Sequence, residues 1–189
     1  MNKITTGILF SLVFIITVIL FLVFRPLSFN QIVGRPTPNV TVNPIDDSQL
    51  KTYVYVTFYG WNDNDPPGTA IAYPKNEDYQ TYHNKAEGVG TYNDPVTFAA
   101  DPKIFSPGTL IYVPYIKKYA IMEDWCAGCI GNQQIDIWAG GDGNNPEELN
   151  TCEENSTRES ELIILSPKQG FETDPSPIFN TQTTECRFY

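Results

Sequence analysis

Beyond residue 50 the chain alternates short apolar runs with turn residues, which is the pattern of a protein built from β-strands. The longest run, residues 52–59, is almost entirely β-branched or aromatic and ends at Gly60. Further strands are expected at residues 110–113, 119–122, 134–138 and 162–165. Turn sequences separate them, and the helices expected are one-turn pieces near residues 101–103 and 146–149. The pattern predicts a small, closed, all-β barrel.

The beginning of the chain has a different pattern, because residues 4–24 carry no charge and are rich in Ile, Leu, Val and Phe. A helix of that length, at about 1.5 Å per residue, spans a hydrocarbon core of ~30 Å. A cleavable signal peptide has a shorter apolar stretch and a small-x-small cleavage site, whereas Arg25 and Pro26 follow here. We therefore expect a transmembrane anchor in residues 1–25 of a single-pass protein, with the C-terminal part outside the cytoplasm or in a lumen.

Two further regions follow the expected anchor. Residues 26–50 contain four prolines and no sustained periodicity, which is typical of an extended stalk. Residues 51–189 are long enough to bury one core and are predicted to form a single barrel domain.

Charge narrows the classes of function. The chain has 22 Asp and Glu against 12 Lys and Arg, a formal net charge of −10. Nucleic-acid binding is therefore not expected, because it depends on Lys and Arg that neutralise phosphates. A single histidine, His83, rules out His-rich metal sites and disfavours a Ser/His/Asp triad. No metal and no other cofactor is expected.

Four cysteines and two sequons bear on the compartment. The four cysteines could form a Cys₄ zinc site or two disulfides. Their irregular spacing and the expected compartment favour disulfides, which can pair in three ways. The cysteines are Cys126, Cys129, Cys152 and Cys186. Asn39 and Asn155 each begin an Asn-x-Thr sequence that is a candidate for N-glycosylation.

Two stretches carry a family resemblance. Residues 56–63, followed by Gly68 and Thr69, resemble the opening strand of expansins and their endoglucanase relatives, an aromatic-Tyr-Gly sequence followed by Asp. Residues 90–138 resemble the three-aspartate domain of lytic transglycosylases and spore-cortex proteins, and the three are Asp101, Asp124 and Asp136. Residues 121–129 and 174–180 are also similar to small secreted fungal proteins of this barrel class. The resemblance implies an all-β, six-stranded double-psi β-barrel, here with an N-terminal transmembrane helix.

The carboxylates are the candidate catalytic groups. Asp136 lies between Ile135 and Ile137, so strand alternation places it on the face opposite theirs. In a partly desolvated cleft it would act as a general acid, the role that the resemblance also implies, or it would tie a loop by hydrogen bonding. Asp124 either orients Asp136 or substrate or is a buried hydrogen-bonded aspartate. Asp101, directly before Pro102, is expected in a turn or helix cap.

The second catalytic group is less defined. The endoglucanase relatives have an aspartate after the first strand, and Asp63 or Asp65 stands there, although residues 62–65 equally form a solvated turn. Expansins lack an effective base and loosen walls without hydrolysis, and transglycosylase chemistry needs none. Hydrolysis by inversion would require the base.

Aromatic residues adjoin the same segments. Sugar rings present apolar C–H faces that stack on Trp and Tyr, so these are candidate substrate platforms, although small barrels also fill their cores with such residues. The candidates are Tyr59, Trp61, Trp125 and Trp138.

Two functional hypotheses follow. The first is a membrane-anchored, expansin-like barrel that binds or loosens cell-wall polysaccharide without strong hydrolysis, with Asp136 as the acid in any lytic activity. The second is a non-catalytic structural module that binds other proteins, such as a membrane-anchored minor capsid or envelope component in the virion membrane of a large virus. The fold alone does not choose between them.

Overall fold

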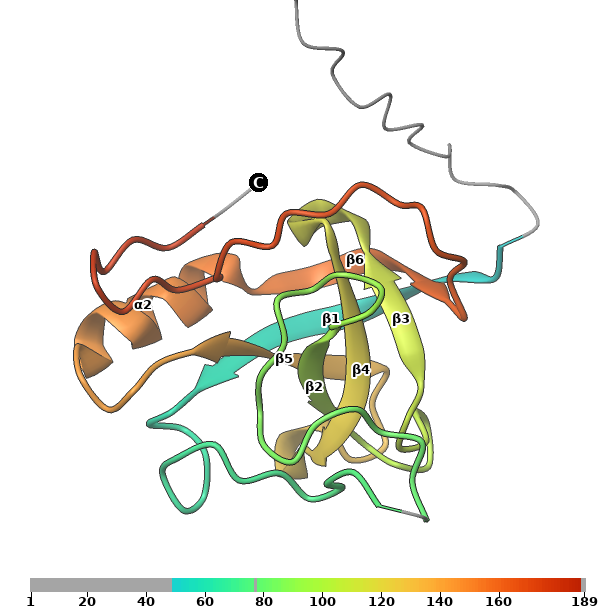
Figure 1. Ribbon diagram of the computed structural model, residues 1–189, viewed down its shortest axis with the longest axis horizontal. Helices are drawn as coiled ribbons and strands as arrows, with labels where there is room; N and C mark the ends of the chain where they lie inside the picture. The colour runs from blue at the N-terminus through green and yellow to red at the C-terminus, as the bar shows by residue number, and fades with distance from the viewer. Residues whose placement is uncertain (1–48, 77, 188–189) are drawn as a thin grey trace, which may run out of the picture. The chain divides into compact units, whose positions relative to one another are not determined.

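The computed structural model describes residues 49–76 and 78–187, in which six strands close into a barrel (Figure 1). The predicted all-β barrel is confirmed, and the five predicted strands are present, four of them longer than predicted and the strand at residues 110–113 with the predicted bounds. The second strand was missed by the sequence analysis. The strands are β1 Lys51–Gly60, β2 Val96–Ala100, β3 Leu110–Val113, β4 Lys118–Trp125, β5 Gln134–Gly140 and β6 Arg158–Leu165.

The strand order around the barrel is β1-β5-β2-β4-β3-β6. The pairs β1–β5 and β2–β4 are parallel, and the other neighbours are antiparallel. The first three strands and the last three occupy equivalent places in this order. If β1, β2 and β3 are exchanged with β4, β5 and β6, the same pairs of strands remain neighbours. The two halves of the barrel therefore have equivalent connections. Parallel neighbours cannot be joined by tight hairpins. The chain therefore crosses the ends of the barrel in long connections, of which residues 61–95 are the longest.

Alternation along β1 separates the core from the outer face. Val54, Val56 and Phe58 point inward and are buried, whereas Tyr53 and Tyr55, at the alternating positions, are exposed. The inward side chains meet apolar residues of the other strands, each contributing about 1.5–3 kcal/mol by burial. These include Phe98, Ile111, Met122, Ile135, Ile137 and Ile163.

Three short helices accompany the strands: η1 Pro114–Ile116, η2 Ala127–Cys129 and α2 Pro146–Ser156. The sequence predicted a single turn near residues 146–149, and this is corrected to an 11-residue helix. Its pattern is weak because most of its residues are polar. Leu149 and Cys152 are buried, and the helix packs against β1 (Figure 1). Tertiary packing rather than helix propensity therefore extends it.

The cysteines form two disulfides, as predicted, and the structure settles their pairing. Cys126–Cys129 spans η2, and Cys152–Cys186 joins α2 to the C-terminal segment. In the described part of the chain no group of three or more His, Cys, Asp or Glu side chains could hold a metal ion.

The predicted fold class is corrected in one respect. Within residues 49–76 and 78–187 no helix is both long enough and apolar enough to span a membrane, so the predicted transmembrane helix is not part of the described fold. The apolar run at residues 4–24, the stalk up to residue 48 and the sequon at Asn39 lie outside the described residues.

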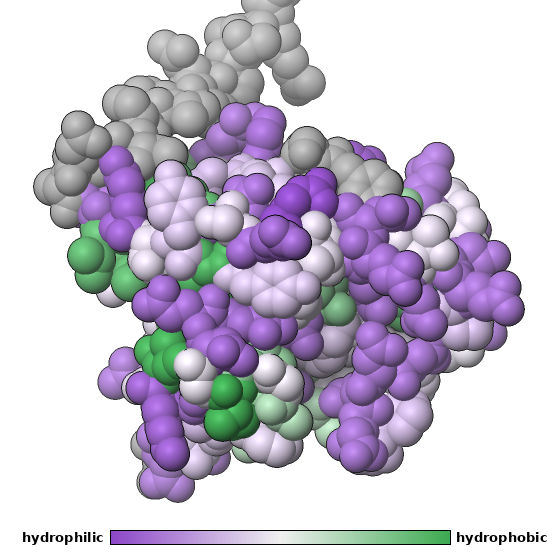
Figure 2. All heavy atoms as spheres, turned by 180° about the vertical axis from the view of Figure 1, so that it is seen from behind, coloured by the Kyte–Doolittle hydropathy of each residue, from purple (hydrophilic) through white to green (hydrophobic). Residues whose placement is uncertain are grey.

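The face shown in Figure 2 is mostly hydrophilic, and its apolar side chains form small, separate patches. Patches this small do not mark a large apolar interface on this face.

Candidate functional site

A cleft of about 580 Å³ opens on the outer face of β1 and β5, against the connection that follows β1. Its lining includes most of the residues that the sequence singled out as catalytic. Those that matter chemically are Thr57, Tyr59, Asp63, Asp124, Trp125 and Asp136. This is the candidate functional site.

Asp136 lies on the outward face of β5, opposite Thr57 in the β1–β5 register. The Thr57 hydroxyl donates to Asp136 Oδ1 at 2.8 Å, and the Gln134 amide donates to the Thr57 hydroxyl at 3.1 Å. Burial raises the pKa of Asp136 to about 6, against the Thr57 hydrogen bond that lowers it, and the charges of Asp63 and Asp124 add to the rise. The carboxyl group is thus half protonated near pH 6 and about one-tenth protonated at pH 7, so it can act as a general acid in mildly acidic solution.

Asp124 has a more complete set of partners. Its Oδ1 accepts the backbone N–H groups of Ala72 and Trp125, each at 2.8 Å, and its Oδ2 accepts the Tyr59 hydroxyl at 3.1 Å. Burial nevertheless raises the pKa of Asp124, with a smaller contribution from Glu123. These contacts fix both walls of the cleft, so Asp124 holds the site in shape, which corresponds to the buried hydrogen-bonded alternative.

A residue that the sequence analysis did not single out, Glu153 on α2, completes the acidic group. Glu153 is 6% exposed, and its Oε1 is buried without a hydrogen-bond donor in the described structure. Burial, together with hydrogen bonding to Asp63 and the charges of Asp63 and Asp136, raises the pKa of Glu153 to about 9. At neutral pH Glu153 is therefore a protonated acid that is hydrogen-bonded with Asp63.

Gly60 makes this arrangement possible. A Cβ at this position would lie 2.7 Å from Glu153 Oε1, 2.7 Å from Leu149 Cδ2 and 2.9 Å from the Gly140 carbonyl oxygen. The glycine lets α2 approach the end of β1 closely, and this contact brings Glu153 to the acidic cleft.

The predicted aromatic platforms have different environments. Trp125 is 51% exposed and lines the cleft, and Tyr59 lines it with its hydroxyl committed to Asp124. Trp138 is 7% exposed and packs edge-on against Tyr59, with ring centroids 5.2 Å apart. Trp61 packs on Gly141 and Gly143 outside the cleft. Trp125 is therefore the side chain available for stacking.

The remaining candidates lie at the edge or outside the cleft. Asp65 is exposed at the rim. Asp101 is buried and accepts the backbone N–H groups of Lys103 and Gly131, which lower its pKa and fit the expected turn role. Asn155 is exposed on α2.

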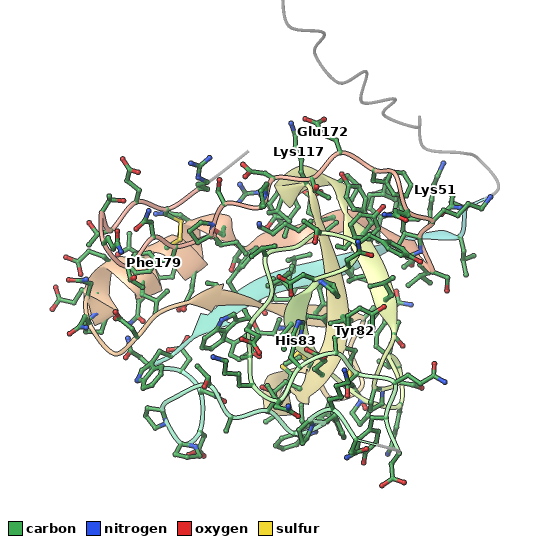
Figure 3. All side chains as sticks on the ribbon, in the orientation of Figure 1. Lys51, Tyr82, His83, Lys117, Glu172 and Phe179 are labelled. Carbon is green, nitrogen blue, oxygen red and sulfur yellow. A yellow bond between two sulfur atoms is a disulfide. The ribbon has the colours of Figure 1, made fainter. Side chains whose placement is uncertain are left out.

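A second ionisable cluster fastens the long connection to the barrel. The two ring nitrogens of His83 lie 2.7 Å from Glu123 Oε2 and 3.0 Å from Asp94 Oδ1. Glu123, fully buried on β4, also accepts the backbone N–H groups of Tyr82 and His83 and the Thr97 hydroxyl. Figure 3 shows Tyr82 and His83 together on this connection. The cluster holds the segment whose residues 70–72 line the cleft.

Glu153 and Glu123 were missed for different reasons. Glu153 stands in a polar stretch where nothing in the pattern indicates burial, and its environment depends on how closely α2 approaches Gly60. Glu123 precedes Asp124 in a strand with seven consecutive buried residues, so alternation could not separate the two carboxylates.

The family model described as "DDB_G0273701 N-terminal domain" matches residues 51–187, which include the whole barrel. An uncharacterized protein of Dictyostelium discoideum, DDB_G0273701/DDB_G0273221, is 36% identical over 137 residues, which cover 69% of this chain. The aligned part spans 58% of that relative's length. No solved structure matches the chain.

Proposed function

The chain belongs to the DDB_G0273701 N-terminal domain family, and we propose that its barrel is an expansin-like double-psi β-barrel that binds polysaccharide in the Asp136 cleft. The equivalent connections of the two barrel halves and the two parallel strand pairs support the double-psi assignment. Two disulfides in the described part of the chain fit an oxidising compartment, where cell-wall polysaccharides occur.

One observation carries the proposal: an exposed indole and a desolvated carboxyl group line the same cleft. Trp125 offers an apolar face for a sugar ring, and Asp136 offers a carboxyl group that is protonated below about pH 6. Thr57 engages Oδ1 of Asp136, which leaves Oδ2 for a ligand hydroxyl or glycosidic oxygen. Stacking and hydrogen bonding at adjacent positions are what a sugar residue requires.

The same geometry favours binding over rapid hydrolysis. Asp63, the base candidate, is hydrogen-bonded with Glu153, so its carboxylate is already engaged by the protein. Inverting hydrolysis needs a free base opposite the acid. The proposed activity is therefore binding or loosening of the polysaccharide, with Asp136 as a hydrogen-bond donor.

The test uses the purified full chain with insoluble cellulose, chitin and peptidoglycan, scoring co-sedimentation and soluble fragments between pH 5 and 8. Binding by the wild-type protein should fall as pH rises through about 6, where Asp136 loses its proton. Asp136→Asn keeps a donor at all pH values, so its binding should not vary over this range, whereas Asp136→Ala should weaken binding about tenfold or more.

The outcomes separate the alternatives. Fragments that disappear in Asp136→Asn would make the protein a lytic enzyme with Asp136 as its acid. Absence of both binding and fragments would overturn the proposal and leave a structural module that binds other proteins.

A further inference from the structure

A second hollow adjoins the cleft on the same strands. It measures about 440 Å³, and its lining includes the exposed Tyr53 and Tyr55 of β1, Asn132 and Gln133 before β5, and Glu159 and Ser160 of β6. Gln134 lines both hollows. The two are therefore adjacent parts of one surface rather than separate pockets.

The strand register makes this surface linear. Tyr53, Tyr55 and Thr57 alternate with the buried residues of β1, so these three point outward, and Tyr59, next in the row, is buried but lines the cleft. Tyr55 pairs with Gln134, and Thr57 pairs with Asp136. Successive outward residues on a strand are about 6.8 Å apart, so the row carries the tyrosines away from Asp136 along a straight line.

The two tyrosines are exposed although each has a neighbour in the sheet. Tyr53 is 63% exposed and pairs with Leu162 of β6, and Tyr55 is 39% exposed and pairs with Gln134 of β5. Side-chain amides of the neighbouring residues 132–134 and the Ser160 hydroxyl lie around them. Aromatic faces bordered by amide and hydroxyl groups suit sugar rings, which are apolar on their faces and polar at their edges.

Charge restricts the sugars. The acidic side chains that line the two hollows in the described structure are Asp63, Asp65, Asp124, Asp136 and Glu159, and no Lys, Arg or His joins them. A polymer of uronic acids would meet like charge over its whole length. A polymer of neutral sugars would not.

We propose that the Asp136 cleft and the Tyr53–Tyr55 hollow form one extended groove for a linear chain of neutral sugars. The inference rests on the function proposed above and extends it: the cleft binds the sugars beside Trp125 and Asp136, and the tyrosines bind those further along the chain. Affinity therefore depends on polymer length.

The experiment measures binding of neutral oligosaccharides of two to eight sugars, from both cellulose and chitin, to the full chain by calorimetry. Wild-type affinity should rise with length. The double variant Tyr53→Ala/Tyr55→Ala should bind the short oligosaccharides as the wild type does and the long ones about tenfold or more weakly. Trp125→Ala should weaken binding at every length.

Tyr82→Ala is the matched control, because Tyr82 is 42% exposed and lies outside both hollows. It should bind like the wild type. Circular dichroism and a thermal melt verify that each variant is folded, which is expected since both groove tyrosines point to solvent.

Each result has a distinct meaning. Wild-type length dependence in the double variant would overturn the extended groove and leave the cleft. Binding that needs the tyrosines but not Trp125 would overturn the cleft as the primary site. Absence of all binding would overturn both proposals. Equal affinity for polygalacturonate would overturn the restriction to neutral sugars.

Discussion

Two buried glutamates, Glu123 and Glu153, are held in opposite states of protonation. Glu123 on β4 accepts four hydrogen bonds, from His83 Nδ1, two backbone N–H groups and the Thr97 hydroxyl. Burial raises the pKa of Glu123, but these donors together lower it by a larger amount, so the net shift is downward. Glu153 on α2 is about as buried, but its neighbours are carboxylates, and its pKa rises to about 9.

The difference shows that burial alone does not decide the charge of a carboxyl group; the donors around it do. Where donors are supplied, at Glu123, the carboxylate fastens the connection that follows β1. Where donors are fewer, at Glu153 and Asp136, burial dominates and the pKa rises, so Glu153 remains protonated at neutral pH and Asp136 is protonated below about pH 6. Carboxyl groups with raised pKa values concentrate at functional sites, which is why the proposed activity is assigned to the cleft that Asp136 lines.

The largest effect is expected from removing the satisfied carboxylate. Glu123→Ala leaves the His83 ring and two backbone N–H groups without their acceptor, so we expect a loss of about 3–5 kcal/mol in the free energy of unfolding, measured with urea. Glu159→Ala, an exposed strand glutamate, should change it by less than about 0.5 kcal/mol. A loss as small as the control's would mean that the four hydrogen bonds do not hold the connection in place.

A smaller effect is expected where α2 meets β1. Gly60→Ala places a methyl group 2.7 Å from Leu149 Cδ2 and 2.9 Å from the Gly140 carbonyl oxygen, so the helix must shift, at a cost of about 1–3 kcal/mol. Gly128→Ala is the control, since its Cβ would meet nothing within 4 Å. Thermal melts of the two variants compare the effects, and equal melting temperatures would argue against the close approach of α2.

The sequence predicted the barrel and the position of Asp136 because both depend on local alternation. Residues 52–59 and 134–138 have the period of a strand, and the same period places Asp136 outward, opposite Thr57. It could not predict β2, whose five residues are all buried and so lack alternation. It could not predict Glu153 either, because that site depends on a helix meeting a strand more than ninety residues away in the sequence. Long-range contacts of this kind leave no local pattern.

The next prediction changes Glu153 itself. A raised folded pKa means that the stabilising contribution is complete below the unfolded pKa of about 4.3 and is lost as pH rises through about 9. Glu153→Gln keeps a donor toward Asp63 without needing a proton, so at pH 8 it should be more stable than the wild type by roughly 1–2 kcal/mol, after allowance for solvent screening. Urea titrations at pH 5 and 8 measure this. A gain that is equal at both pH values would contradict a protonated Glu153.

The smallest effect concerns His83 and is best measured in the Glu153→Gln background, where the larger pH dependence has been removed. Desolvation lowers the pKa of His83, but the hydrogen bonds and charges of Glu123 and Asp94 outweigh it, and the net shift is upward. The stabilising contribution is then complete below the unfolded pKa of about 6.5 and declines as pH rises through the raised folded pKa. The unfolding free energy should therefore decrease between pH 6 and 7.5 in both proteins, because Asp136 with its pKa of about 6 is still losing its proton, but it should decrease further with His83 present, by at most roughly 1 kcal/mol, than in His83→Gln. The pH range ends at 7.5 because burial lowers the pKa of Lys118 to about 8, and its deprotonation would change stability in the opposite direction.

An equal decrease in both proteins would place the titrating group elsewhere and would remove His83 from the set of contacts that hold the wall of the cleft.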